Sequence, residues 1–330
     1  GRMNKTVGRV YLTDIYNVIH SEFVPLFNPF QSYFDHLPSW DGVSDPIGDL
    51  ADTVHVKSDQ AEFRDYFRKW FVGILPALLD DTVVNHEILV LIGEQGLYKT
   101  TWFNFLLPPE LRCYFYTKTN SDRLNKDDLF SLTEFALICF EELDGMRPAE
   151  LNQLKALITK DSILERRPYA RNAETFVRRA SFAATVNDSQ ILTDRTGSRR
   201  FLCVSLEHAI DCTTPVEYEQ LYAQLKAELQ SGERSWFNKE EEQAIQQHNA
   251  LFYKHIPEEE VFRLCFRFAT KEDHPQEVLT LSATQLFERM KSAHPSVMRG
   301  MTAYSLSRIL PRLGERVHTA KGNVYRVVAC

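Results

Sequence analysis

The sequence predicts an α/β protein in which a largely parallel sheet is covered by helices on both faces. Short, wholly apolar segments recur along the chain, and segments with helical spacing of apolar residues lie between them. Strands of a parallel sheet are buried on both faces, so they read as continuous apolar runs. The runs expected as strands are residues 87–92, 111–117, 135–140, 181–186 and 200–204.

Helices are expected before and between these strands. Residues 60–79 carry aromatic side chains at helical intervals, which predicts an amphipathic helix whose aromatic stripe packs into the core. Another helix is expected over 148–159, because Pro148 suits a first helical position. The 330 residues suggest about two domains. The expected division is a mainly helical segment 1–80, a core 81–210, an acidic helical region 211–274 and a small domain 275–330.

Composition excludes several protein classes. The hydrophobic fraction of 44% is ordinary for a globular protein, and the six cysteines form no CxxC pair that would indicate a zinc ribbon. Apolar runs such as Ile88–Ile92 are far shorter than the ~18 residues that span a bilayer. No charged-then-apolar leader opens the sequence. We therefore expect a cytoplasmic protein with no membrane partner.

Charge is distributed unevenly along the chain, whose net charge is −7. Residues 155–200 contain ten basic and five acidic side chains, and residues 285–326 contain eight basic and two acidic ones. Between them, residues 205–260 contain twelve acidic and four basic side chains. The two basic segments favour local anion-binding surfaces. The alternative is that these side chains are scattered over solvated faces.

The loop after the first expected strand has the composition of a phosphate-binding loop. It reads GEQGLYKTT over residues 93–101. Such loops use glycines where backbone amides approach phosphate, then lysine for the β- and γ-phosphates and a hydroxyl for Mg²⁺. Tyr98 stands where the usual pattern has glycine. The residues expected to bind nucleotide are Gly93, Gly96, Tyr98, Lys99, Thr100 and Thr101.

Polar residues follow two of the other expected strands. Glu141 and Glu142 end the strand 135–140, and acid pairs at this place in nucleoside triphosphatases hold Mg²⁺ and polarise water. The alternative is a solvent-facing acidic turn. Asn187 ends the strand 181–186, where it would orient water or contact the γ-phosphate, or be an ordinary loop residue. Arg199 and Arg200 precede the last strand; paired arginines serve as charge-neutralising fingers or are surface residues.

Together these motifs resemble the virulence-associated protein E family, whose ATPase core is similar to superfamily 3 helicases of the AAA+ type. The resemblance covers roughly residues 28–260, and the run Asp194-Arg195-Thr196-Gly197-Ser198-Arg199-Arg200 is its most specific element. Tyr98 departs from the family's usual glycine. The other matching stretches are Asn28-Pro29-Phe30, Tyr33, Trp40-Asp41-Gly42, GEQGLYKTT (93–101), FEELDG (140–145), Leu154-Lys155, Arg167-Pro168-Tyr169 and Thr185-Val186-Asn187.

The resemblance implies a P-loop NTPase fold with ATP and Mg²⁺ as cofactors. It makes Lys99 the phosphate ligand and gives Thr100 and Glu141 to the metal. Glu142 would orient water, and Asn187 would be the sensor. Arg199 or Arg200 would act across a subunit boundary, which implies a homo-oligomer, typically a hexameric ring. A primase-like partner is expected as well, because the family often encodes one before the ATPase.

The resemblance also implies contacts with single-stranded DNA. The segment 160–179 falls where superfamily 3 helicases place a DNA-touching hairpin, so its basic residues would follow phosphates. Tyr169 would stack on a base or, equally, pack internally. The residues expected to contact nucleic acid are Lys160, Arg166, Arg167, Tyr169 and Arg171.

The last 50 or so residues predict a winged-helix-like domain. Ser282 and Thr302 are placed to cap two helices, and Pro311 predicts a kink or an early end in the second. Two β-like runs, 316–319 and 324–328, follow as a hairpin. The second helix and the hairpin of such a domain contact nucleic acid. A small protein-interaction domain is the alternative.

The function predicted from the whole sequence is an ATP-dependent single-stranded DNA motor, a helicase-like translocase in the replication of a mobile element or phage-related process. One alternative is a nucleotide-binding switch without useful hydrolysis, which the altered loop at Tyr98 favours. The other is a DNA-binding initiator or defence assembly protein, which the basic C-terminal segment favours.

Overall fold

Two compact units, residues 1–253 and 254–330, make up the chain. The expected boundary at residue 275 is therefore too late in the sequence. Residues 211–253 pack with the first unit, and residues 254–274 belong to the second. The computed structural model describes residues 9–19, 21, 23–25, 27–119, 126–146, 148–167, 172–192, 198–254, 256–270, 272–319 and 322–330.

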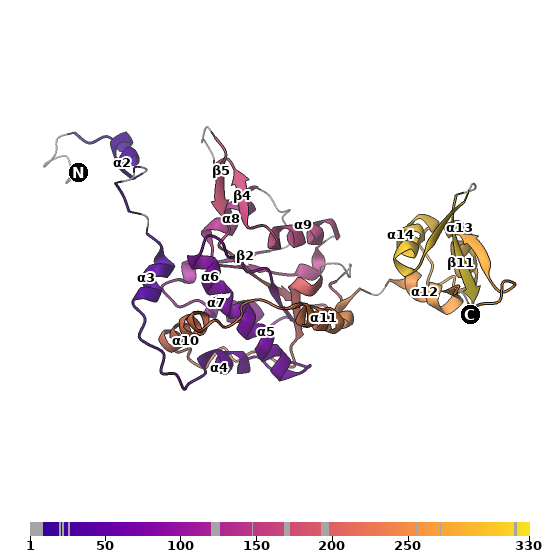
Figure 1. Cartoon of the computed structure of the whole chain (residues 1–330), viewed down its shortest axis with the longest axis horizontal. Helices are drawn as coiled ribbons and strands as arrows, with labels where there is room; N and C mark the ends of the chain where they lie inside the picture. Colours follow the sequence, from indigo (N-terminus) through magenta and orange to yellow (C-terminus); the bar gives the residue numbers. More distant parts are fainter. Residues whose placement is uncertain are drawn as a thin grey trace. The chain divides into compact units, whose positions relative to one another are not determined.

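A five-stranded sheet forms the centre of the first unit (Figure 1). Its strands run in the order β2-β3-β6-β1-β7, and every pairing is parallel, which confirms the predicted α/β class. Strand β6 lies between β1 and β3. The strands are β1 (Ile88–Ile92), β2 (Phe115–Lys118), β3 (Leu137–Phe140), β6 (Ser181–Val186) and β7 (Phe201–Ser205).

Helices bury both faces of this sheet. Leu89 and Leu91 of β1 join a core formed with helices α3 to α7 and α10, whereas Ile88, Val90 and Ile92 join a second core formed with α8 and α9. Because both faces are covered, the strand has no polar face, which explains its continuous apolar sequence.

The helix expected over residues 60–79 is divided in two at Gly73. Pro76 has no N–H to donate to the carbonyl of Val72, so a helical hydrogen bond is lost there, which favours a break between α5 and α6. The helices of this unit are α2 (Leu12–Ile19), α3 (Pro29–Asp35), α4 (Pro46–Asp52), α5 (Gln60–Val72), α6 (Ile74–Leu79), α7 (Lys99–Phe105), α8 (Lys126–Glu134), α9 (Pro148–Ile158), α10 (Tyr218–Ser231) and α11 (Lys239–His248). Short 3₁₀ turns are η1 (Arg112–Tyr114), η2 (Leu143–Gly145), η3 (Ser198–Arg200) and η4 (Asn249–Phe252).

An antiparallel hairpin, β4 (Ser162–Glu165) and β5 (Glu174–Val177), leaves the central sheet after α9. Figure 1 shows it standing out from the rest of this unit. Leu164, in the outer half of the hairpin, is 68% exposed. The hairpin expected within residues 160–179 is therefore present.

The second unit has its own core of helices packed on an antiparallel sheet. The two expected helices and the hairpin are present, and Ser282 and Thr302 both form capping boxes. Pro311 lies inside the last turn of its helix. The first helix, α12, falls in the region 211–274 that was expected to be helical and acidic, whereas the two short strands β8 and β9 were not expected. The elements are α12 (Pro257–Cys265), β8 (Phe266–Phe268), β9 (Leu279–Ser282), α13 (Ala283–Ala293), α14 (Ala303–Leu313), β10 (Arg316–Thr319) and β11 (Gly322–Ala329).

Two of the six cysteines lie inside the central sheet. Cys139 of β3 and Cys203 of β7 are buried, and burial raises the pKa of both thiols. Cys113 in the first unit and Cys330 in the second are exposed. Within the part of the chain that the structure describes, no helix is both long and apolar enough to cross a bilayer.

Glu87, just before β1, makes the stability of the first unit dependent on pH. Burial, its largest influence, raises the pKa of Glu87 to about 7, and Arg178 and Arg200 oppose this shift. Between pH 4.5 and about 7, Glu87 is therefore protonated in the folded state and ionised in the unfolded chain. The free energy of unfolding then falls as pH rises from about 4.5 through about 7, by up to about 3 kcal/mol.

Glu87→Gln removes this ionisation, so we expect the variant to unfold at higher urea than the parent at pH 8 and at similar urea at pH 4.5. All four tryptophans lie in the first unit, so tryptophan fluorescence measures its unfolding alone. Glu207→Gln, at an exposed position, is the matched control. If the urea midpoints of the parent and Glu87→Gln differed by the same amount at both pH values, Glu87 would not be the source of the pH dependence.

Candidate functional site

A cavity of about 350 Å³ opens at the carboxyl edge of the central sheet. The loop between β1 and α7 forms one side of it, and the residues that follow β3 and β6 form the other. The parallel pairing of these strands brings their carboxyl ends to the same edge. The lining residues are Gln95, Gly96, Leu97, Tyr98, Lys99, Thr100, Thr101, Glu141, Glu142, Thr185 and Asn187.

Lys99 occupies the centre of this site. Its side chain is buried, and its ammonium group donates to the carbonyl of Gly93, to that of Glu94 at 2.8 Å and to Asn187 Oδ1 at 3.3 Å. The buried cation therefore lies where its own loop meets the end of β6. Lys99 and Asn187, which are 88 residues apart in sequence, belong to one polar cluster.

Thr100 and Glu141 form the second polar contact of the site. The Thr100 hydroxyl donates to Glu141 Oε1 at 2.8 Å. It connects the first turn of α7 to the end of β3, although the strand β6 lies between β1 and β3. The two residues expected to hold a metal ion therefore present their oxygens side by side.

Left-handed backbone conformations occur at three positions in the site. Gly96 has φ +88°, which glycine adopts without a steric cost. Tyr98 and Glu142 have φ values of 60° and 53°, and they are the two non-glycine residues with positive φ among those described. Tyr98 thus adopts a backbone conformation that is ordinary for glycine. For tyrosine this conformation costs about 1–2 kcal/mol. The departure from the usual loop sequence does not prevent the turn from forming.

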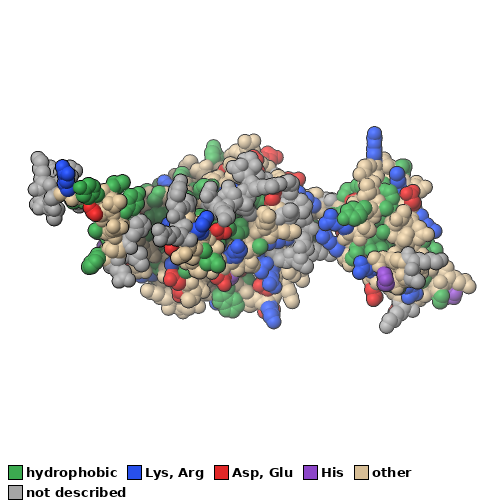
Figure 2. Space-filling model, turned by 90° about the horizontal axis from the view of Figure 1, so that it is seen from above, with side chains coloured by type: hydrophobic (Ala, Val, Ile, Leu, Met, Phe, Trp, Pro, Cys, Tyr) green, Lys and Arg blue, Asp and Glu red, His purple; other side chains and the backbone are tan. Residues whose placement is uncertain are grey.

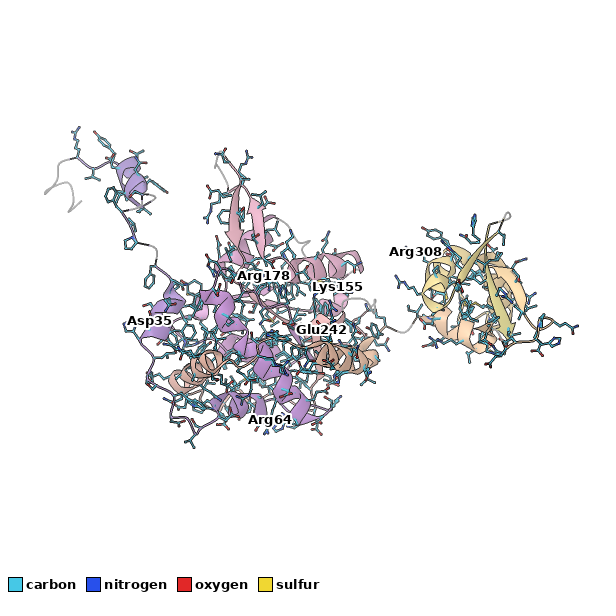
Figure 3. The ribbon with its side chains drawn as sticks, in the orientation of Figure 1. Asp35, Arg64, Lys155, Arg178, Glu242 and Arg308 are labelled. Carbon is cyan, nitrogen blue, oxygen red and sulfur yellow. The ribbon has the colours of Figure 1, made fainter. Side chains whose placement is uncertain are left out.

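Arg199 and Arg200 do not join this cavity within one chain. The register pairs Phe201 with Ile88, so both arginines lie at the amino edge of the sheet, five strand residues away from the loop. A strand of that length spans roughly 16 Å. Arg199 instead pairs with Glu242 of α11 at 3.1 Å. Glu242 is labelled in Figure 3.

The residues expected to contact DNA lie on or beside the β4–β5 hairpin where the structure describes them. Lys160 and Arg166 are exposed, and the Arg167 guanidinium lies 4.7 Å from the ring centre of Phe176. Tyr169 and Arg171 fall outside the described residues, as do Asp194 to Gly197 of the arginine motif.

Three lining residues escaped the sequence analysis: Gln95, Leu97 and Thr185. Thr185 lies one residue before the end of β6, where it reaches the cavity. A hydroxyl near the carboxyl end of the run SFAATV, two residues before Asn187, is the signal that could have found it. For Gln95 and Leu97 the signal was only their position on either side of Gly96.

The fold and cavity define an α/β protein with a polar site at the carboxyl edge of a parallel sheet. The family model of the virulence-associated protein E-like domain matches residues 35–254. The chain therefore belongs to the virulence-associated protein E-like family, as the sequence motifs indicated. A second model, a domain of unknown function called DUF3874, matches residues 255–327 and so coincides with the second unit.

Comparison with solved structures finds the apo C-terminal region of NrS-1. Two of these structures have 12% sequence identity and TM-scores of 0.48 and 0.47, and a third has 14% identity and a TM-score of 0.49. Each match covers 90% of this chain and 77–78% of the other. The curated proteins contain no match.

The positive φ of Tyr98 predicts how substitutions there change stability. Because Tyr98 is 57% exposed, its replacement removes little packing. Valine is β-branched and tolerates this conformation poorly, so Tyr98→Val should lower the free energy of unfolding by about 1–2 kcal/mol. Tyr98→Gly should leave it unchanged or slightly raised, because relief of strain offsets the flexibility of glycine.

Urea unfolding followed by tryptophan fluorescence measures both variants. Tyr11→Val, at an exposed position that is not among the residues of positive φ, is the control and should have no effect. A Tyr98→Val protein as stable as Tyr98→Gly would show that the loop relaxes to another conformation.

Proposed function

We propose that the chain binds ATP with Mg²⁺ in this cavity and hydrolyses the nucleotide to move along single-stranded DNA in the replication of a mobile element. One observation carries the proposal: Lys99, Thr100, Glu141 and Asn187, from three strand ends, form one contiguous polar cluster. Membership of the virulence-associated protein E-like family supports it.

The residues present fit a magnesium ion. Mg²⁺ binds oxygen ligands octahedrally at 2.0–2.1 Å, so neighbouring ligands lie roughly 2.9 Å apart, and the Thr100 and Glu141 oxygens are 2.8 Å apart. Among the described residues, no group of three or more His, Cys, Asp or Glu side chains is placed to hold a metal. That suits an ion held by one carboxylate, one hydroxyl and phosphate oxygens. When bound, the ion neutralises charge on the phosphates.

The side chains of the site divide the remaining work. Lys99 presents a buried positive charge to the β- and γ-phosphates, where low solvent exposure strengthens its attraction. Glu142, beside the metal ligand Glu141, accepts a hydrogen bond from the attacking water and orients it. Asn187 contacts the Lys99 ammonium through its amide oxygen, which leaves the amide N–H₂ to the γ-phosphate or the water.

Arg199 and Arg200 support an assembly in which neighbouring chains complete each other's sites. Both lie at the sheet edge opposite the cavity, so an arginine reaches a nucleotide only on an adjacent chain. Contacts between two different edges repeat head to tail, and they close into a ring when the rotation permits. A hexameric ring is the assembly that we propose.

The β4–β5 hairpin is the proposed contact with single-stranded DNA. It leaves the sheet, and Lys160 and Arg166 are exposed on it or beside it. Basic side chains that follow a flexible strand supply affinity without reading sequence.

A nucleotide-binding switch without useful turnover is the second candidate. The strained conformation of Tyr98 favours the switch. A tyrosine beside Lys99 has fewer accessible backbone conformations than glycine, so the loop changes shape less readily during the reaction.

The first experiment is ATP hydrolysis with and without single-stranded DNA. We expect DNA-stimulated turnover that falls at least about 100-fold in Lys99→Ala, which loses charge stabilisation. Glu142→Gln should bind ATP and fail to turn it over. Lys239→Ala, which removes an exposed lysine on α11, is the control. Binding of ATP by the parent without any turnover would replace the motor with the switch.

Mixing inactive variants tests the shared sites. Lys99→Ala and Arg200→Ala should each be inactive alone. In an equal mixture about a quarter of the interfaces join an intact loop to an intact arginine, so about a quarter of parental activity should return. Each variant at doubled concentration is the control and should stay inactive. Mixed assemblies that recover no activity would show that Arg200 does not act between chains.

A further inference from the structure

The second unit carries a basic stripe on helix α14. Tyr304, Arg308 and Arg312 are spaced four residues apart and all are exposed, with Tyr304 at 73%. Leu306 and Leu310 on the opposite side are fully buried in the core. Residues four apart share one helix face, so the three side chains form a stripe directed away from the unit. Figure 3 shows Arg308 on the outer side of α14.

The charges of this stripe are not neutralised within the described residues. No acidic side chain described lies within ion-pair distance of Arg308 or Arg312. In the same unit, Arg263 and Arg267 are paired with Glu259 and Asp273. Two further arginines without a described ion pair flank α14: Arg299 precedes it and Arg316 begins β10. Acidic Glu315 is also exposed there, and Glu258 accepts a hydrogen bond from Ser305 at 3.0 Å.

The stripe is held on a rigid support. The capping box of Thr302 and Ser305 fixes the start of α14. At its end, a Cβ on Gly314 would lie 2.4 Å from ring atoms of Phe268, so only glycine permits this close packing of the helix end on β8. Helix and hairpin therefore keep one relative orientation.

The ligand class follows from the shape and chemistry of the stripe. A projecting helix of 11 residues is about 16 Å long and fits the major groove of B-DNA, and the hairpin that follows suits the adjacent backbone. A single-stranded ligand would need a series of exposed aromatic rings. Among the large exposed hydrophobic residues described in this unit, Tyr304 is the one aromatic.

We propose that the second unit binds duplex DNA, with α14 in the major groove and Arg308 and Arg312 contacting the DNA directly. The unit thereby holds double-stranded DNA independently of the nucleotide site of the first unit. This adds a duplex-binding surface that neither the proposed ATP hydrolysis nor the β4–β5 hairpin supplies.

The test is fluorescence anisotropy of the full chain with a labelled duplex of about 20 base pairs, at salt concentrations between about 50 and 200 mM. Arg308→Ala/Arg312→Ala should raise the Kd at least about tenfold. It should also reduce the slope of log K against log salt by about 2, one for each lost contact. Arg308→Lys/Arg312→Lys should retain most of the slope.

Arg263→Ala is the matched control, since this arginine is 63% exposed but already paired with Glu259. It should change neither Kd nor slope. No binding of duplex by the parent at about 50 mM salt, or an unchanged Kd and slope in the double alanine variant, would overturn the proposal and leave the stripe to a protein partner. ATP hydrolysis, measured on the same proteins, separates failure of this inference from failure of the proposed function.

Discussion

The burial of the central sheet on both faces is the constraint on which the rest of the first unit depends. Its strands have no polar face, so polar side chains near it occur at strand ends. Parallel pairing collects the carboxyl ends at one edge. Lys99, Glu141 and Asn187, from distant parts of the sequence, therefore meet in one cavity, and the register of β7 sends Arg199 and Arg200 to the opposite edge.

The sheet and most of the site could be predicted from the sequence because the relevant signals are local. A continuous apolar run predicts a buried strand, and a polar residue directly after it predicts a residue at the sheet edge. Those rules located Glu141 and Asn187, and the composition of the loop after β1 located Lys99 and Thr100. The structure brings the four residues together. The capping residues Ser282 and Thr302 were equally local, because the bonds they make span three residues.

What escaped prediction depends on contacts between distant segments. The pairing of Arg199 with Glu242 depends on where α11 packs, and no pattern near either residue shows it. Strand β8 has three residues, too few for an alternation to be read, and it exists because β11 pairs with it. The unit boundary was misplaced because acidic composition continues through α11 into α12, although the two helices pack in different cores. The left-handed backbone of Tyr98 was unexpected because tyrosine rarely adopts it.

The distribution of the cysteines has a practical consequence. Thiol reagents need an accessible sulfur that can ionise, and the sheet denies both to Cys139 and Cys203. The two exposed thiols, Cys113 and Cys330, belong to different units. Cys212 and Cys265 are half-buried, so each unit carries one exposed attachment point. A pair of fluorescent dyes there would turn any movement of one unit relative to the other into a change in energy transfer.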